Sequence, residues 1–296
     1  MRTVSIVGLG RAGGAIAVAL DKAGFQIELV VSRDRSVSRK KLAQLSLTSD
    51  PTVSTLDERT PITSSVVLVA VPDPFIAQTA ELLSERIKQA SCVLHISGSL
   101  PSDILLGKFA GSVPVGSFHP LVSLSDASTG RSSFQGAFFC VEGDAESVKI
   151  GNELAIALGG RPFTIEPRMK PLYHAAAVMA AGHVVALFDL ACEVLSKTGL
   201  AGPSPPEVLW PLVASAVDNL RVQTASRSLT GSFARGDLET IERHIDALQG
   251  EGPFLALQAY RLLGAHSVDL ARAEGVDENI CRAIMDVLNL DKEIGE

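Results

Sequence analysis

The sequence has few of the features that mark secreted, nucleic-acid-binding or metal-stabilised proteins. Its cysteines are few and far apart and include no Cys-x-x-Cys pair: Cys92, Cys140, Cys192 and Cys281. This spacing argues against a disulfide framework or a zinc site and predicts reduced, mostly buried thiols in a cytoplasmic protein. Basic residues number 26 against 33 acidic ones, and the net charge of −7 argues against a general binder of nucleic acid or of anionic membranes.

Long hydrophobic runs free of polar residues are also scarce. The most membrane-like stretch, 175–195, contains His183, Asp189 and Glu193, so we expect a core or interface helix there and no membrane span. The chain starts directly on a strand, so we expect no secretory leader. With 46% hydrophobic and 20% charged residues the composition is that of a folded protein, and 296 residues predict two domains.

A glycine-rich turn close to the N-terminus carries the clearest signal. An apolar run at residues 4–7 ends in Gly-x-Gly-x-x-Gly, which is followed by residues spaced as in a helix: Gly8, Leu9, Gly10, Arg11, Ala12 and Gly13 form the turn. Here Gly8 allows a tight turn, Gly10 lets the backbone approach a pyrophosphate, and Gly13 lets helix and strand pack closely. The helix N-terminus favours the anion. The strand–turn–helix context predicts a dinucleotide site, although such turns also occur without a ligand.

The end of the second predicted strand, 26–31, bears on the choice of cofactor. NAD enzymes place an acidic residue there, whereas NADP enzymes place small polar and basic groups that hold the 2′-phosphate. This chain has Ser32 and Arg33, with Arg35 and Arg11 nearby, and the first acid, Asp34, comes two residues late. The residues favour NADP (as NADPH) over NAD, and the alternative is that the arginines are solvated loop charges.

Further strands and helices alternate as far as residue 166. We predict a short basic helix at 36–46, a further helix at 145–158, and strands at 52–54, 65–71, 92–96, 115–121, 137–141 and 161–165. The apolar β-branched run at 65–71 is typical of a central parallel strand covered on both faces. The alternation predicts a Rossmann α/β fold with a doubly wound, mostly parallel sheet over residues 1–166.

Polar residues follow three of these strands, where the cofactor crevice of such a sheet lies. The candidates for cofactor contacts are Val71, Pro72, Asp73, Ser97 and Gly98, and Ser99 is a candidate for substrate contact. Asp73 could equally be a helix N-cap, and the serines could form a turn and cap. His119 ends the 115–121 strand and could polarise a carbonyl or imine or donate a proton. The alternative is a structural histidine.

From residue 167 the pattern becomes entirely helical. We predict an all-α domain at 167–296 with helices at 169–198, 206–227, 237–249, 253–264 and 277–288. The first of these helices is so apolar that it must be buried in the core or against a second subunit. We therefore expect a homodimer formed through the helical domain.

This layout resembles the superfamily of 6-phosphogluconate, β-hydroxyacid and pyrroline-5-carboxylate reductase-type enzymes. More closely, it is similar to the Rossmann-like proteins grouped with the deazaflavin-dependent NADP reductases. The resemblance covers essentially the whole chain and is carried by four segments, residues 8–13, 117–121, 170–177 and 229–237. It implies an oxidoreductase and does not supply the substrate.

The 229–237 segment is interpreted partly through that resemblance. In pyrroline-5-carboxylate reductases a similar turn helps to build the substrate pocket across the dimer, which makes Thr230, Gly231 and Arg235 substrate candidates. Arg235 suits a carboxylate through its fork of donors. The alternative is a well-capped connection in which Asp237 caps the next helix and Arg235 forms a structural ion pair.

Lys170 and His174 lie one helical turn apart and can face the same way. β-Hydroxyacid dehydrogenases similarly carry a catalytic lysine followed, one turn later, by asparagine, and the histidine here departs from that pattern. Both residues are candidates for proton transfer, with a solvated lysine and an interface histidine as the alternative. No histidine lies four residues from His183, so we predict no metal site.

The main hypothesis is an NADP-dependent oxidoreductase that reduces a carbonyl or imine of a small anionic substrate held between the domains. Two alternatives stay open: a non-catalytic dinucleotide-binding or sensing protein, and hydride exchange between NADP and a deazaflavin.

Overall fold

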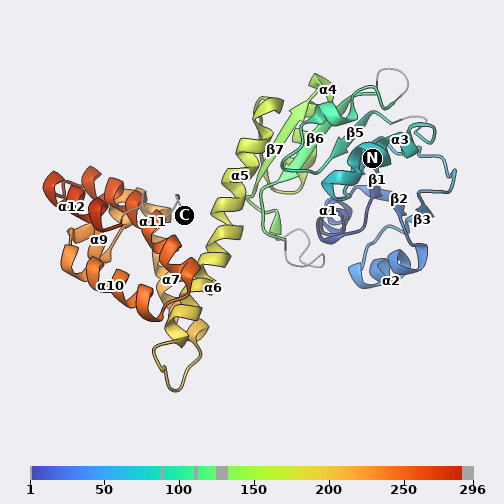
Figure 1. Ribbon diagram of the computed structural model, residues 1–296. Helices are drawn as coiled ribbons and strands as arrows, with labels where there is room; N and C mark the ends of the chain where they lie inside the picture. The colour runs from blue at the N-terminus through green and yellow to red at the C-terminus, as the bar shows by residue number, and fades with distance from the viewer. Residues whose placement is uncertain (1, 88–89, 110–112, 125–132, 289–296) are drawn as a thin grey trace. The chain divides into compact units, whose positions relative to one another are not determined.

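A computed structural model describes residues 2–87, 90–109, 113–124 and 133–288 (Figure 1). The chain forms two compact units, Met1–Ala181 and Gly182–Glu296. We call them the sheet unit and the helical unit and describe each by itself. The predicted fold class, a Rossmann-like domain with a mostly parallel sheet followed by a helical region, is confirmed.

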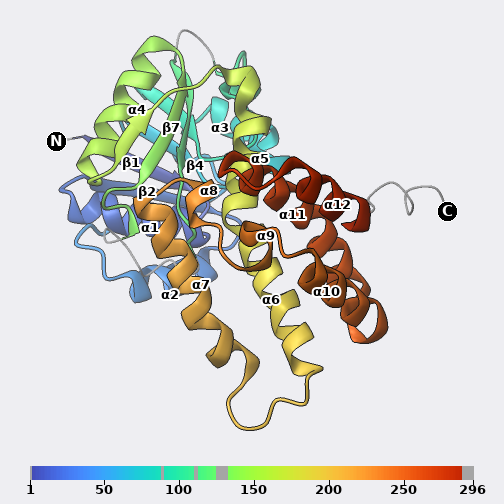
Figure 2. The ribbon, with the colours of Figure 1, turned by 90° about the vertical axis from the view of Figure 1, so that its left-hand side faces the viewer.

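An eight-stranded sheet with the order β3-β2-β1-β4-β5-β6-β7-β8 organises the sheet unit (Figures 1 and 2). The strands are β1 (Thr3–Val7), β2 (Gln26–Ser32), β3 (Thr52–Thr55), β4 (Val66–Val69), β5 (Cys92–His95), β6 (Val115–Pro120), β7 (Phe138–Gly143) and β8 (Arg161–Phe163). Only the β6–β7 pair is antiparallel. The carboxyl ends of β1, β2, β4, β5 and β6 therefore share one edge of the sheet.

Helices cover both faces of this sheet. They are α1 (Arg11–Lys22), α2 (Arg35–Leu45), α3 (Ile76–Ser84) and α4 (Ala145–Ala157). The unit also contains α5 (Lys170–Ala180), in which only Lys170 is buried, and the short 3₁₀ helices η1 (Asp73–Phe75), η2 (Ser102–Leu105) and η4 (Pro167–Met169). Successive residues of a strand point to opposite faces. Thus Leu68 of β4 packs in the core that α1 and α4 cover, while Val67 and Val69 pack in the core that α3 covers. Burial on both faces explains the unbroken apolar run of this strand.

The helical unit contains seven helices within the described residues. They are α6 (Gly182–Ser196), α7 (Pro205–Val222), α8 (Ala225–Ser228), α9 (Gly231–Arg235), α10 (Leu238–Glu251), α11 (Phe254–Ala273) and α12 (Glu278–Leu288). Its core joins apolar residues of α10, α11 and α12, among them Ile245, Leu257 and Ile284. This core is small, and α6 and α7 contain no buried residue.

The structure differs from the prediction at the first long helix. The predicted helix 169–198 is divided into α5 and α6 at Ala181, whose φ of −123° and ψ of −66° depart from helical values. The unit boundary falls at the same place, later than the predicted 166/167. The physical reason is that α5 is tied to the sheet: Lys170 and Tyr173 hydrogen-bond to groups on or next to its strands.

Candidate functional site

The glycine turn between β1 and α1 is sterically specified at two positions. Gly8 has a φ of +99°, and a Cβ there would lie 2.5 Å from the carbonyl oxygen of Ala70. A Cβ on Gly13 would lie 2.1 Å from the carbonyl oxygen of Gly8. The turn and the close packing of helix on strand therefore both require glycine, as predicted.

Gly10 differs from these two glycines because space lies beside it. A Cβ at Gly10 would meet no atom within 4 Å, and the residue is exposed at the N-cap of α1 without a side-chain capping bond. The backbone N–H groups at this end of α1 are open, and the helix dipole favours an anion there. The turn thus fits the pyrophosphate of a dinucleotide, with Leu9, Arg11 and Ala12 as its remaining residues.

The end of β2 presents hydroxyl and cationic groups. The Ser32 hydroxyl receives a 2.6 Å hydrogen bond from Ser38 of α2, and Arg33 is exposed. Asp34 is the N-cap of α2: its carboxylate accepts bonds from Ser36 and Val37, which lower its pKa. The carboxylate that could bind a ribose diol is therefore already engaged in capping.

Lys41, which sequence reasoning missed, joins this region to the glycine turn. Its Nζ donates a 3.1 Å hydrogen bond to the carbonyl oxygen of Leu9. Lys41 lies three residues after Ser38 and thus on the same face of α2. Counting helical turns from Asp34 could have placed Lys41 and Ser38 on one face of α2. Only the folded structure shows that this face lies against the glycine turn.

A carboxylate and two hydroxyls meet where β4 and β5 end. One carboxylate oxygen of Asp73 accepts hydrogen bonds from Ser97 Oγ at 2.8 Å and from Ser99 Oγ at 2.7 Å. The N-cap of η1 is Pro72, so Asp73 does not have the N-cap role that the sequence left open. Val71 and Pro72 lead from β4 into this cluster. The structure thus brings together side chains that are 24 and 26 residues apart in the sequence.

His95, at the end of β5, is a second residue that sequence reasoning missed. It is fully buried; its Nδ1 accepts a bond from the backbone N–H of Ser97, and its Nε2 lies 3.2 Å from the carbonyl oxygen of Pro101. Burial, aided by the charge of Lys170, lowers the pKa of His95 to about 4. A neutral ring donating from Nε2 satisfies both bonds and holds the 97–101 loop.

Two histidine rings pack against Gly98. A Cβ at this glycine would lie 2.3 Å from Nδ1 of His174 and 2.7 Å from Nε2 of His119. The two rings meet edge to face at 5.7 Å, and Nδ1 of His174 is buried without a hydrogen-bond partner. Nδ1 of His119 lies 2.8 Å from the hydroxyl of Tyr173. Gly98 therefore provides the space in which both histidines reach the loop.

Lys170 is fully buried beneath this cluster. Its Nζ donates hydrogen bonds to the carbonyl oxygen of Ser97 at 2.8 Å and to Ser117 Oγ at 2.7 Å. Burial lowers the pKa of Lys170, and the nearby Cys140, Glu142 and Asp73 oppose that shift. The ammonium thus joins α5 to the ends of β5 and β6, in a position closed to solvent.

The remaining predicted substrate residues lie in the helical unit. Thr230 and Gly231, with a φ of +81°, begin α9, and both are exposed. Arg235 is 66% exposed and lies 3.9 Å from Asp237, which caps α10 through the N–H of Thr240, as the capped-connection interpretation predicts. A charge pair this exposed adds little stability, so Arg235 remains available to an anion.

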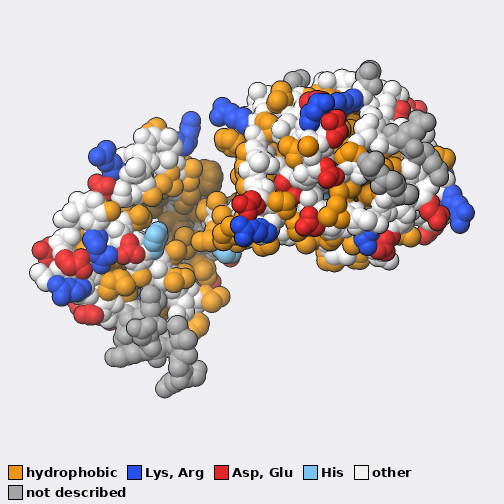
Figure 3. Space-filling view, turned by 90° about the horizontal axis from the view of Figure 1, so that it is seen from above, with side chains coloured by type: hydrophobic (Ala, Val, Ile, Leu, Met, Phe, Trp, Pro, Cys, Tyr) orange, Lys and Arg blue, Asp and Glu red, His pale blue; other side chains and the backbone are white. Residues whose placement is uncertain are grey.

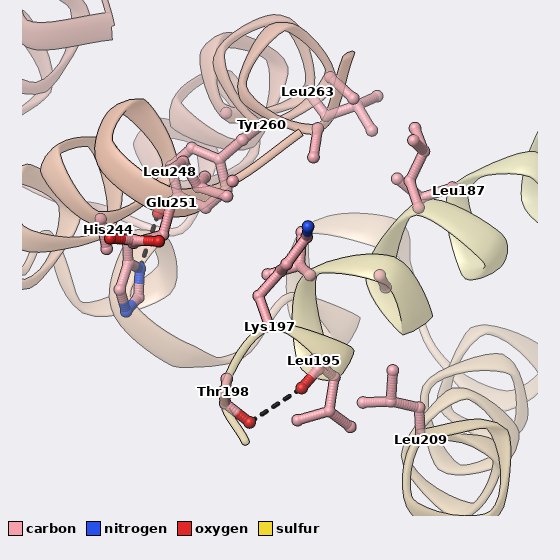
Figure 4. A pocket seen from close by; sticks show the side chains of 18 of the residues that line it. Leu187, Leu195, Lys197, Thr198, Leu209, His244, Leu248, Glu251, Tyr260 and Leu263 are labelled. Atoms are coloured by element: carbon pink, nitrogen blue, oxygen red, sulfur yellow. Dashed lines mark hydrogen bonds between the residues drawn. The ribbon is translucent and has the colours of Figure 1, made fainter. Parts of the chain in front are cut away.

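The helical unit also contains an apolar cavity of about 730 Å³ (Figure 4). Leu187 and Leu195 of α6, Leu209 of α7 and Leu263 of α11 line it. The hydroxyl of Tyr260 lies 2.9 Å from Nδ1 of His244 at its wall. In the described part of the chain, no three histidine, cysteine, aspartate or glutamate side chains are grouped as a metal site.

Apolar side chains are exposed across α6 and α7, as Figure 3 shows for the surface of the helical unit. By length and composition, Pro167–Ser196 could cross a membrane, with a mean hydropathy of 1.8, but one such segment is weak evidence. Of the two places predicted for this stretch, the core of its own chain or an interface with a second subunit, the first is not observed, because its apolar window has no buried residue. An interface with a second subunit stays a prediction.

Two family profiles match parts of the chain. A Rossmann-like domain matches residues 1–120, and a Domain of unknown function (DUF2520) matches residues 137–267. Neither match spans half of the 296 residues. No curated protein matches the sequence.

Solved structures share the fold over nearly the whole chain. Protein TM1727 from Thermotoga maritima is 26% identical, with a TM-score of 0.72, covering 92% of this chain and 99% of its own. BF3122 from Bacteroides fragilis, a candidate NADP oxidoreductase, is 20% identical with a TM-score of 0.67, over 96% and 98%. A 1-pyrroline-5-carboxylate reductase from Streptococcus pyogenes is 14% identical with a TM-score of 0.59, over 98% and 99%. These likenesses support the oxidoreductase resemblance at the level of fold, and the deazaflavin grouping stays a prediction.

Proposed function

We propose that this protein is an NADP-dependent oxidoreductase that reduces a carbonyl or imine of a small anionic substrate. The observation that carries the proposal is the shared edge of the sheet. The open glycine turn after β1, Asp73 after β4, Ser97 after β5 and His119 near the end of β6 all lie at the carboxyl ends of strands, where open α/β sheets bind ligands. Proteins of the same fold carry the names of NADP oxidoreductase and pyrroline carboxylate reductase.

In this proposal the residues of the glycine turn bind the cofactor. Gly8 to Gly13 hold the pyrophosphate on the N-terminus of α1, while Val71, Pro72, Ser97 and Gly98 lie along the nicotinamide end of the crevice. Bound NADPH supplies a hydride. The chain's own contribution is to bind, to orient and to handle the proton.

The preference for NADP over NAD is proposed from the end of β2. Ser32 offers a hydroxyl and the exposed Arg33 offers a cation. Lys41 adds a second cation, which its hydrogen bond to Leu9 holds at the glycine turn. Asp34 is engaged at the N-terminus of α2 and presents no competing carboxylate. A 2′-phosphate gains from two cations, whereas a 2′-hydroxyl does not.

Proton transfer is assigned to Lys170 or His174, with His119 as the group that polarises the substrate. The buried Lys170 is held by the carbonyl oxygen of Ser97, and the hydroxyl of Ser117, to which it also donates, is the group that could pass a proton on. Ser99 is the proposed substrate contact in the sheet unit. Thr230, Gly231 and Arg235 are those of the helical unit, where Arg235 suits a carboxylate.

We further propose a homodimer, formed through the helical unit, in the cytoplasm. The support is the exposed apolar surface of α6 and α7, which includes Val185 at 70% and Leu212 at 67% exposure. Large apolar side chains exposed on neighbouring helices are typical of subunit interfaces.

One binding experiment tests the cofactor assignment. Titration of the protein with NADPH and NADH by calorimetry should show tighter binding of NADPH. Lys41→Ala should weaken NADPH binding about fivefold and leave NADH almost unchanged, because one charge-assisted contact is lost. The matched control is Lys40→Ala, the neighbouring exposed lysine of α2. Equal binding of the two cofactors would contradict the NADP assignment, and absence of binding would contradict the function.

A second experiment tests catalysis. Keto acids, cyclic imines and a deazaflavin are screened for oxidation of NADPH, with Lys170→Ala and His174→Ala as controls. Turnover of a keto acid or cyclic imine supports the proposed function, turnover of the deazaflavin alone supports hydride exchange, and binding without turnover supports a sensor. Turnover that survives both substitutions would show that the proton-transfer assignment is wrong.

A further inference from the structure

His119 is held as a neutral ring, so what it can do depends on which nitrogen carries hydrogen. Burial, with the charges of Lys170 and His174 as further causes, lowers the pKa of His119 to about 3. A neutral imidazole has one N–H donor and one acceptor nitrogen, and its hydrogen-bond partners select between the two tautomers.

Tyr173 is the partner that makes this selection. Its hydroxyl lies 2.8 Å from Nδ1 of His119 and forms no other hydrogen bond to a described residue. Burial raises the pKa of Tyr173, so the phenol keeps its hydrogen. If the O–H donates to Nδ1, the one described acceptor within its reach, the ring hydrogen is left on Nε2.

The opposite edge of the ring is the edge that a ligand can reach. Nε2 of His119 has no hydrogen-bond partner among the described residues, and the ring as a whole is only partly buried. It lies beside Gly98, where any side chain would occupy the same space. The free donor therefore faces the loop that also presents Ser97 and Ser99.

We propose that Tyr173 is a positioning residue that fixes His119 in the tautomer with hydrogen on Nε2. His119 then donates a hydrogen bond to the oxygen or nitrogen of the substrate's C=O or C=N group. This inference rests on the proposed function for its role in catalysis, but not for the tautomer itself. Donation by a neutral ring stabilises the negative charge that develops on that atom when hydride arrives at the carbon.

The tautomer can be measured without substrate or cofactor. In protein labelled with ¹⁵N in its six histidines, the side-chain nitrogen shifts separate protonated from unprotonated ring nitrogens. His119→Gln identifies the signals of residue 119. We expect hydrogen on Nε2 and none on Nδ1 at neutral pH, and hydrogen on Nδ1 in the wild-type protein would overturn the proposal.

The chain provides a matched control in its second tyrosine. Tyr260 and Nδ1 of His244 are 2.9 Å apart, and their rings meet edge to face at 5.8 Å, close to the 5.7 Å of Tyr173 and His119. Tyr173→Phe should convert His119 to a mixture of tautomers, while Tyr260→Phe should leave its signals unchanged. An unchanged tautomer in folded Tyr173→Phe would refute the selection by Tyr173.

Kinetics then test the role in catalysis. With a substrate from the NADPH screen, Tyr173→Phe should lower kcat about tenfold with little change in KM, because a donor to the transition state is lost from part of the population. Tyr260→Phe should change neither. If NADPH does not bind, the proposed function fails while the tautomer stands. If NADPH binds and turns over but kcat is unchanged in Tyr173→Phe, the positioning role fails alone.

Discussion

The two units of this protein differ in how much of their apolar helices they bury. In the sheet unit, nine of the twelve residues of α1 are buried against the sheet. In the helical unit, α6 and α7 are at least as apolar as α1 and bury no residue. The helix α1 therefore covers its apolar face within the chain, whereas α6 and α7, like α5 at the end of the sheet unit, leave apolar faces that need a further surface to cover them.

The difference extends to polar groups. The sheet unit buries ionisable side chains, among them His95 and Lys170, and satisfies them with hydrogen bonds to loops and strand ends. Among its described residues the helical unit buries one charged side chain, Arg261, while ion pairs such as Arg243 with Glu239 are exposed. Chemistry that depends on neutral histidines and a buried ammonium thus has its environment in the sheet unit.

The largest expected effect breaks the close packing of the sheet unit. Gly13→Ala forces a Cβ to within 2.1 Å of the carbonyl oxygen of Gly8. We expect a loss of about 3 kcal/mol in the free energy of unfolding, measured by urea denaturation, because backbone atoms must shift.

Gly10→Ala is the matched control for that change. Its Cβ meets no atom and its backbone is extended, so stability should change by less than about 0.5 kcal/mol. NADPH binding should nevertheless weaken, because the new methyl group lies where the pyrophosphate is proposed to approach. Equal stability losses in the two variants would contradict this account of the turn.

The second prediction concerns the free energy of unfolding at acid pH, through a buried histidine of the sheet unit. The pKa of His95 is about 4 in the folded protein and about 6.5 in the unfolded chain. As pH falls from about 6.5 to about 4, the unfolded chain takes up a proton that the folded one does not, so stability is lost in that window. We expect a loss of about 2 kcal/mol from this residue, in urea unfolding at pH 7 and pH 4.5.

The variant His95→Asn should remove this share of about 2 kcal/mol from the wild-type loss, while the share of His119, whose pKa is also lowered, should remain. His266→Gln, at an exposed position of α11, should retain the wild-type loss. A wild-type stability that is the same at both pH values would show that His95 is not held neutral.

The third prediction, with the smallest expected effect, tests whether the exposed apolar surface of α6 and α7 forms a dimer interface. The double variant Val185→Glu, Leu212→Glu on α6 and α7 should weaken the proposed dimer at least about tenfold in sedimentation equilibrium, because charges enter an apolar interface. The matched double variant in the sheet unit is Leu106→Glu, Ile156→Glu, at 56% and 63% exposure, which should dimerise normally. A wild-type monomer would contradict the dimer, and equal weakening by both variants would contradict its location.

Sequence patterns were sufficient wherever one local rule decides the structure. The order of strands and helices in the sheet unit follows from apolar runs and glycine stops, and the cap of Asp237 on α10 from its position before a helix. The predicted helix 169–198 misses the break at Ala181, because hydrophobic periodicity continues through that residue while the break depends on α5 being tied to the sheet. Periodicity carries no information about such long-range contacts.

The residues of the candidate site fall into the same two groups, those that local rules predict and those that only the folded chain identifies. Gly8, Gly10 and Gly13 could be assigned roles from spacing alone, since backbone conformation limits which residues fit a tight turn. His95, Lys41 and Tyr173 could not, because their roles come from partners 2, 32 and 54 residues away that only the folded chain identifies. Of these, His95 has a near partner, but its second bond and its burial belong to the tertiary structure.

The sequence by itself determined a Rossmann-type sheet, a glycine turn with room for an anion, and a helical second half. Local sterics and periodic burial are sufficient for these features. The tertiary structure alone decided that Lys170 is buried on Ser97 and Ser117, that His119 is neutral with Tyr173 at its Nδ1, and that α6 and α7 lack cover in their own chain. Burial and hydrogen bonding set these states, and both depend on residues that meet only when the chain folds.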